Sequence, residues 1–199
     1  MGARIAVVDY HKGNLLSVQR GLSDAGFNAV ITDDAAAIRS ADGIVLPGVG
    51  AFADAMATMN ETGQADAIRA AVAAGAPFLG ICLGLQLLFE SSEESPGVEG
   101  LGILKGQILR IPDQEGLKIP HIGWNSLTLQ HQGRLFAGLE EHPYVYFVHS
   151  YYLKARDEQI VKAVTDYSTC IHASVEQGNI FACQFHPEKS SSTGLKILK

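Results

Sequence analysis

The first half of the chain alternates between short apolar runs and segments in which apolar residues recur at helical spacing. Leu15, Val18 and Leu22 show that spacing, with Asn14 before them as an N-cap and Gly26 after them as a C-cap. Strands that alternate with helices predict right-handed βαβ units and a parallel sheet covered on both faces. The apolar runs that predict its strands are residues 5–8, 29–31, 44–46 and 78–81.

The second half follows a different pattern. Residues 91–106 are rich in Gly, Ser and Glu, which predicts loops, and a last helix includes Leu195 and Leu198. We therefore expect one α/β domain over residues 1–199, with a central, mostly parallel sheet to which the C-terminal half adds antiparallel strands. The strand-like pieces of this half are residues 107–111, 126–129, 144–148, 160–164, 171–175 and 180–185.

Composition narrows the class of protein. With 47% hydrophobic and 18% charged residues, the 199-residue chain is typical of a soluble globular protein with a substantial core. A net charge of −6 offers no electrostatic footprint for nucleic acid, and no apolar run is long enough to span a bilayer. The chain enters a predicted strand at once, so no signal peptide is evident. Its three cysteines lack paired spacing and favour a reducing cytoplasm.

Cys82 lies in the run Gly80-Ile81-Cys82-Leu83-Gly84, where a predicted strand gives way to helical periodicity. A sharp strand-to-helix turn strains the backbone, and the flanking glycines remove the Cβ atoms that would clash there. The thiol is then held beside the first free N–H groups of the helix, which favour a thiolate. The run by itself is equally typical of a free cysteine packed among small residues, so the nucleophile hypothesis needs a second signal.

That second signal is His186-Pro187-Glu188 near the end of the chain. Proline disfavours the α conformation for the residue before it, so His186 should be extended and Glu188 should project to the same side. The carboxylate can then bind one ring nitrogen, directly or after a small bend, and aim the other at Cys82. The alternative is an exposed loop with two solvated side chains, and the elbow favours the catalytic interpretation. The order cysteine, histidine, acid differs from that of α/β-hydrolases.

Several polar or glycine-rich segments directly follow predicted strands. Asp9-Tyr10, Pro47-Gly48-Val49-Gly50 and Cys82 should therefore meet at one rim of the sheet, where doubly wound folds bind ligands. Glycine N–H groups of the second segment could hold an oxyanion, although the segment alone is equally typical of a simple turn. It lacks the spacing of a Walker loop or a dinucleotide fingerprint, so no nucleotide site is predicted.

Two other features admit more than one interpretation. The spacing of Cys183 and His186 resembles half of a zinc site, but alternation with Phe181 and Phe185 places Cys183 on an apolar face, so we interpret it as a core thiol. Trp124 is the only tryptophan. A lone tryptophan is usually part of the core, yet its glycine and asparagine neighbours leave an interface role open.

Taken together, the motifs resemble those of the class I (triad) glutamine amidotransferases, through residues 47–50, residues 80–84 with Gln86, and residues 186–188. Within that class the chain is similar to the glutaminase subunits of imidazole glycerol phosphate synthases. His11-Lys12 departs from the pattern, where a small or polar residue is expected. The resemblance implies a flavodoxin-like fold. The narrower similarity is carried by Asp9-Tyr10 with Gly13–Leu15, Lys118–Asn125, Phe147–Tyr151 and Phe185–Ser190.

The resemblance also implies a reaction, in which glutamine and water give glutamate and ammonia. Cys82 would attack the amide carbonyl and form a thioester, His186 would move the protons, and Glu188 would orient His186. No metal and no organic cofactor are implied. Backbone N–H groups implied for the oxyanion hole belong to Val49, Gly50 and Leu83. Residues implied to hold L-glutamine are Gly48, Gln86, His149, Ser150 and Tyr151.

The partner implied by the resemblance is a (β/α)8-barrel cyclase subunit, which uses the ammonia in histidine biosynthesis. Asn14, Trp124 and Lys189 are the residues we expect at that interface. Free subunits of this kind are nearly idle until nucleotide substrate binds to the partner. Glycines 48 and 50 suggest a cause, because they allow the loop peptide to turn either its carbonyl or its N–H toward the site.

Three alternatives remain at this point. An amidotransferase subunit for chorismate, guanylate or pyridoxal phosphate synthesis is disfavoured by the runs Gly123–Asn125 and Glu188–Ser190. A flavodoxin-like cysteine hydrolase or chaperone would lack the trailing His-Pro-Glu. A non-catalytic interaction module on the same fold would be expected to have lost its nucleophile or its base.

Overall fold

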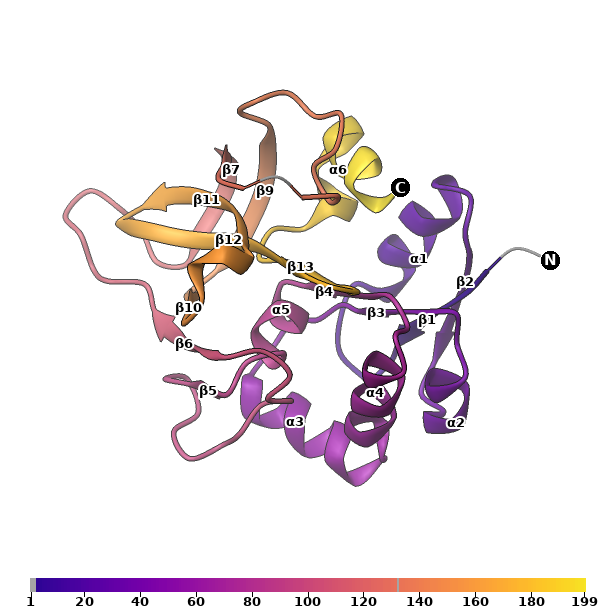
Figure 1. Ribbon diagram of the computed structural model, residues 1–199. Coiled ribbons are helices and arrows are strands. Elements are labelled where there is room, and N and C mark those ends of the chain that lie inside the picture. The colour runs from indigo at the N-terminus through magenta and orange to yellow at the C-terminus, as the bar shows by residue number, and fades with distance from the viewer. Residues whose placement is uncertain (1–2, 132) are drawn as a thin grey trace.

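The computed structural model describes residues 3–131 and 133–199. Its centre is an eight-stranded sheet (Figure 1). In spatial order the strands are β2 (Asn28–Thr32), β1 (Arg4–Val8), β3 (Gly43–Leu46), β4 (Phe78–Ile81), β13 (Ile180–Cys183), β12 (Thr169–Gln177), β11 (Val161–Tyr167) and β8 (Thr128–Leu129). The first five of these are parallel, and the last three pair antiparallel, so the predicted mixture of strand directions is confirmed.

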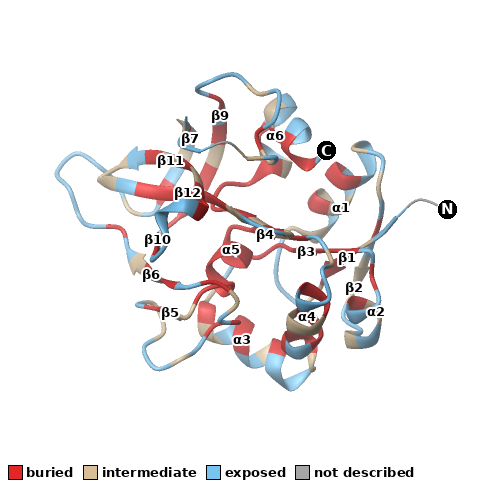
Figure 2. Ribbon diagram, viewed as in Figure 1, coloured by how far each residue is buried: buried red, intermediate tan, exposed pale blue. Residues whose placement is uncertain are grey.

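Helices cover both faces of the parallel part of the sheet. Alternate residues of β1 belong to two different apolar clusters: Val7 packs on one face, and Ala6 and Val8 pack on the other. A strand buried on both sides must be apolar throughout, which is why the sequence shows continuous runs there. Figure 2 shows β3, for example, as buried. One face carries α1 (Leu15–Asp24) and α6 (Ser191–Leu198), and the other carries α2 (Ala35–Arg39), α3 (Phe52–Glu61), α4 (Gln64–Ala73) and α5 (Leu83–Leu87).

The second half of the chain adds two smaller sheets beside the central one (Figure 1). β10 (Tyr151–Ala155) pairs with β6 (Gly106–Arg110), which also pairs with β5 (Ser91–Ser92). β7 (His121–Ser126) pairs antiparallel with β9 (Tyr144–His149). Short 3-10 helices lie at η1 (Glu158–Ile160) and η2 (Pro187–Lys189). Ser150 therefore joins a strand of one small sheet to a strand of the other, close to the functional rim.

Some sequence-based expectations were wrong in detail. The strand expected over residues 126–129 is two strands, because β7 ends at Ser126 and β8 begins at Thr128. α2, α3 and most of β7 were not predicted, since these elements are half-exposed or rich in alanine and show no clear period. β10 is mostly buried but was missed because a single residue separates it from β9, and β5 lies within the stretch that was expected to form loops. Asn14 does occupy the N-cap position of α1, but its side chain makes no capping hydrogen bond.

None of the helices in the described part of the chain is long and apolar enough to cross a membrane.

Candidate active site

Cys82 lies at the turn between β4 and α5, in a backbone conformation that side-chain-bearing residues rarely adopt, with φ 55° and ψ −108°. The two flanking glycines make this turn possible. A Cβ atom on Gly80 would lie 2.7 Å from the carbonyl oxygen of Gly84, and one on Gly84 would lie 1.8 Å from the carbonyl oxygen of Leu46. The close approach of backbone to backbone thus requires glycine at both positions, as the sequence predicted.

Strand register brings the His-Pro-Glu segment beside this turn. β13 runs parallel to β4 with Cys183 opposite Ile81, and the Cys82 N–H donates to the Cys183 carbonyl at 2.8 Å. The chain that leaves β13 must therefore pass next to Cys82. His186 is extended, with φ −102° and ψ 96°, as expected for a residue before proline. The following turn of η2 supplies the bend that returns Glu188 to the imidazole.

The imidazole of His186 and the carboxylate of Glu188 form a buried pair. Nδ1 of His186 lies 2.9 Å from Oε1 of Glu188, and the two side chains are 2% and 1% exposed. Burial alone would lower the pKa of His186, but hydrogen bonding and charge from Cys82 and Glu188 outweigh it and raise that pKa to about 10. The Glu188 carboxylate at Nδ1 thus favours the protonated form of the imidazole beside the sulfur.

Two contacts surround the thiol of Cys82, which is itself buried. The sulfur lies 3.8 Å from the Val148 carbonyl oxygen and 3.6 Å from Nε2 of Gln184. Within residues 3–131 and 133–199, Nε2 of His186 has no aligned hydrogen-bond partner, although Cys82 is near enough to raise the pKa of the ring. A small rotation of the thiol would complete that contact, as apo sites often require.

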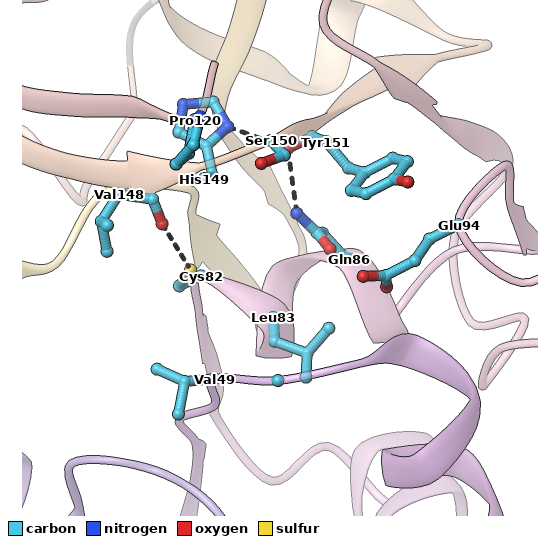
Figure 3. A pocket seen from close by; sticks show the side chains of 11 residues that line it. Val49, Cys82, Leu83, Gln86, Glu94, Pro120, Val148, His149, Ser150 and Tyr151 are labelled. Carbon is cyan, nitrogen blue, oxygen red and sulfur yellow. Dashed lines mark hydrogen bonds between the residues drawn. The ribbon is translucent and has the colours of Figure 1, made fainter. Parts of the chain in front are cut away.

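A pocket of about 370 Å³ opens over the sulfur (Figure 3). Gln86 and Glu94 point into it from one side, while Val49 and Leu83 lie below the sulfur and Val148 lies above it. The pocket thus brings together the predicted nucleophile and most of the residues expected to hold glutamine. Its lining comprises Val49, Gly50, Cys82, Leu83, Gln86, Glu94, Pro120, Val148, His149, Ser150 and Tyr151.

The loop expected to form the oxyanion hole is held in one orientation. The Leu83 N–H, one of the predicted donors, donates to the Gly48 carbonyl at 3.4 Å and is therefore engaged. Gly48 packs on the hydroxyl of Tyr10, which a Cβ atom at position 48 would approach to 1.9 Å. Gly50 has φ +102°, a conformation that favours glycine. Burial, and then the nearby Cys82, raise the pKa of Tyr10 well above its usual range.

His149 supports the pocket wall through a second buried histidine that the sequence analysis missed. Its Nδ1 lies 2.8 Å from the Tyr151 carbonyl, so Nδ1 is the donor and Nε2 accepts from Nδ1 of His121 at 3.1 Å. Stacking of the His121 ring between Phe147 and Tyr167 fixes its position. Burial lowers the pKa of His121 to about 4. Burial also lowers the pKa of His149, to about 3. The hydrogen bond to the Tyr151 carbonyl acts against this shift, and the charges of His121 and His186 act with it.

These two depressed pKa values predict acid sensitivity of the fold. In the unfolded chain both rings take up protons as the pH falls below 6.5, whereas in the folded protein they stay neutral to about pH 4 and pH 3. Stability present above pH 6.5 is therefore lost on acidification, by about 2–5 kcal/mol between about pH 6.5 and about pH 4.5. Urea unfolding at several pH values measures it. His121→Phe keeps the ring stack and should flatten the slope, and an equal slope in both proteins would contradict the assignment.

The expected interface residues lie on the surface. Trp124 is 51% exposed on β7, beside Ile122 at 59%, and Tyr144 on β9 is 58% exposed. The alternative that the lone tryptophan belongs to the core is therefore wrong. Lys189 is exposed directly after Glu188, and Asn14 is partly exposed at the start of α1.

Two supporting residues were not predicted, although Ser190 ends the Phe185–Ser190 motif and Gln184 directly precedes it. Ser190 accepts from the Tyr146 N–H at 3.0 Å and donates to the His186 carbonyl at 2.7 Å, which ties β9 to the histidine. Gln184 is fully buried next to the sulfur, and a single polar residue inside an apolar run was the available signal. Cys183 is fully buried in an apolar cluster, as expected for a core thiol. Among the described residues no group of three or more His, Cys, Asp or Glu could hold a metal ion.

Comparison with known proteins places these motifs in a family. The profile of the family described as "Glutamine amidotransferase class-I" matches residues 6–199. An imidazole glycerol phosphate synthase subunit HisH from Moorella thermoacetica is 50% identical over 98% of this chain and 92% of its own length. The subunit of the same name from Aquifex aeolicus is 49% identical over 98% of this chain and 94% of its own length.

Solved structures agree on the fold. A glutamine amidotransferase matches with a TM-score of 0.75 at 20% identity, covering 96% of this chain and 94% of its own. PurLQS from Thermotoga maritima contains a chain that matches with a TM-score of 0.73 at 24% identity, covering 99% and 96%. At such identities the likeness concerns the fold alone. The family profile and the near full-length relatives decide the rest: this chain belongs to the class-I glutamine amidotransferases.

Proposed function

We propose that the chain is the glutaminase subunit of an imidazole glycerol phosphate synthase. It hydrolyses L-glutamine to glutamate and ammonia and passes the ammonia to a cyclase subunit in histidine biosynthesis. The observation that carries the proposal is the juxtaposition of Cys82, which lines the pocket, with the buried His186–Glu188 pair. The identity of about half the residues with HisH subunits along nearly the whole chain supports the choice of pathway.

In this proposal Cys82 is the nucleophile. Its sulfur, as a thiolate whose proton has passed to His186, forms a bond to the side-chain carbonyl carbon of glutamine, and the resulting tetrahedral intermediate expels nitrogen as ammonia, which takes that proton from His186. A thioester remains. His186, now neutral, accepts a proton from water as that water attacks the thioester carbon, and glutamate leaves as the carbon–sulfur bond breaks. Glu188 keeps Nδ1 of the ring occupied at 2.9 Å, so Nε2 is the atom that moves the protons.

The loop at Gly48 offers a reason for low activity of the isolated chain. The oxyanion of the intermediate needs N–H donors, and we assign these to Leu83 and to Val49 or Gly50. In the structure the Leu83 N–H instead donates to the Gly48 carbonyl, over a long N···O distance of 3.4 Å. Movement of that carbonyl away from α5 would free the donor. The glycines at positions 48 and 50 give this loop the freedom for such a change.

Glutamine would occupy the pocket beside Gln86, with the chain from His149 to Tyr151 forming the facing wall. Gly48, which was also expected to hold glutamine, is not among the residues that line this pocket. The exposed apolar side chains of Ile122 and Trp124 lie on β7, whose partner strand β9 supplies Val148 to the site. We assign this surface, with Asn14 and Lys189, to contact with a (β/α)8-barrel cyclase, so that ammonia passes between subunits. A cytoplasmic location, where the free thiols stay reduced, is part of the proposal.

A three-part glutaminase assay tests the proposed function. Glutamate release is measured for the chain alone, with the cyclase subunit, and with the cyclase and its nucleotide substrate. We expect activity to rise in that order. The same rate of glutamate release with and without the cyclase would instead favour an amidotransferase of another pathway. No hydrolysis under any condition would favour a non-catalytic module.

Trp124→Ala is expected to weaken binding of the cyclase without disturbing the fold. Exposed tryptophans at the centre of an interface often cost about 2 kcal/mol or more when truncated, which corresponds to a dissociation constant raised about 30-fold. Calorimetric titration of the cyclase measures it, and circular dichroism checks the fold. Val30→Ala is the matched control, because Val30 is exposed on the edge strand β2, away from β7. Equal affinities of both variants would remove Trp124 from the interface.

A further inference from the structure

Gln184 is a fully buried amide for which the mechanism above assigns no part. It directly follows β13, and its backbone N–H donates to the Ala173 carbonyl at 2.9 Å, so its position is set by the central sheet. The register of β13 against β4 places it next to Cys82. A buried amide that lacks hydrogen-bond partners destabilises the fold, so the partners of the Gln184 side-chain oxygen and NH₂ group indicate its role.

The orientation of two amide groups follows from one backbone carbonyl. The Tyr151 carbonyl can only accept, so Gln86 must turn its NH₂ group to it, at 3.0 Å. The same nitrogen lies 3.1 Å from Gln184, whose oxygen must therefore face Gln86. The NH₂ group of Gln184 is then the end that meets the Cys82 sulfur, at 3.6 Å. The Tyr151 carbonyl also accepts a hydrogen bond from Nδ1 of His149, at 2.8 Å.

Each end of this chain of contacts has a chemical consequence. A hydrogen bond donated to sulfur stabilises the thiolate over the thiol. At the other end, both hydrogens of the Gln86 NH₂ group are used, so its oxygen is the atom left for the pocket that Gln86 lines. A free oxygen acceptor recognises an N–H group of a ligand, whether ammonium or amide.

We propose that Gln184 is a positioning residue of the glutaminase site, which donates a hydrogen bond to the Cys82 sulfur and locks the Gln86 amide with its oxygen toward the substrate. This inference deepens the proposed function and rests on it for the identity of the substrate. The hydrogen bond to sulfur does not depend on glutamine. The two parts can therefore be tested separately.

Gln184→Glu tests the contact with sulfur. The carboxylate keeps the size and still accepts from Gln86, but it presents oxygen in place of N–H to Cys82. We expect alkylation of Cys82 by iodoacetamide at neutral pH to slow by about tenfold or more, with its pH profile displaced upward by about one unit. Mass spectrometry of the Cys82 peptide separates this reaction from that of the exposed Cys170. For glutamine hydrolysis with the cyclase, kcat should fall while KM stays near the wild-type value.

Gln184→Leu tests the lock on Gln86. It removes both contacts, so the Gln86 amide is free to rotate, and we expect KM for glutamine to rise about tenfold in addition to the fall in kcat. An unchanged KM would overturn the assigned orientation of Gln86.

Gln64→Leu is the matched control, because Gln64 is also fully buried and donates to the backbone carbonyls of Asp9 and Asp33, at 2.8 and 3.0 Å, rather than to the sulfur. It should lower the unfolding temperature yet leave the Cys82 alkylation profile and KM unchanged. If Gln184→Leu does not fold, Gln184→Glu still decides the contact with sulfur.

A folded Gln184→Glu protein with the wild-type alkylation profile would overturn the proposal. Failure of the wild-type complex to hydrolyse glutamine would refute the proposed function instead, and the alkylation result would stand by itself.

Discussion

Cys82→Ala is expected to abolish glutamine hydrolysis, alone and in the complex, by a factor of about 10⁴ or more. Without sulfur no thioester forms, and water is not positioned to attack the amide directly. Release of glutamate measures the loss. Cys170→Ala is the matched control, because Cys170 is exposed on β12, away from the pocket, and should keep full activity. A Cys82→Ala protein within about tenfold of wild type would remove Cys82 as nucleophile.

The same position tests whether strain is stored at the elbow. Cys82 has φ 55°, a backbone conformation that glycine adopts without strain and alanine does not. Cys82→Gly should therefore be as inactive as Cys82→Ala but more stable than it, by about 1–2 kcal/mol in the free energy of unfolding. Equal stability of the two variants would mean that the turn relaxes when the thiol is removed.

Local sequence patterns were sufficient for the parallel half of the fold. β1, β3 and β4 are buried on both faces, so their apolar runs are continuous and easily recognised. β7 was largely missed because exposed residues alternate with half-buried ones along it, and one of the half-buried positions is a glycine, Gly123. Its backbone pairs with β9, and pairing between distant segments leaves little trace in a local pattern.

The reactive groups were easier to predict than their supports. Cys82, His186 and Glu188 stand in short motifs, and the neighbouring glycines and proline indicate the backbone conformation that each motif requires. The contact of Gln184 with Cys82 depends on the register of β13 against β4, which joins segments about a hundred residues apart in the chain. Likewise the resemblance named His149 for the glutamine site, but its ring is turned away to His121, which only the packing of β7 on β9 reveals.

Gly84→Ala is expected to destabilise the fold strongly. The first turn of α5 packs so closely on the end of β3 that an added Cβ atom would lie 1.8 Å from the Leu46 carbonyl oxygen. Backbone on both sides cannot give way as a flexible side chain would. We expect a loss of about 3–5 kcal/mol in the free energy of unfolding, or a melting temperature lower by about 10 °C.

Gly116→Ala separates this clash from the ordinary cost of replacing glycine. Gly116 has φ +84°, and nothing lies within 4 Å of an added Cβ atom, so only backbone strain of about 1–2 kcal/mol is expected. Because Gly84 itself has no positive φ, the excess loss of Gly84→Ala over Gly116→Ala is a lower limit on the cost of this clash between α5 and β3, which holds Cys82 at the tip of the elbow. A Gly84→Ala protein no less stable than Gly116→Ala would mean that this contact is loose. The glycine after Cys82 would then serve only the turn itself.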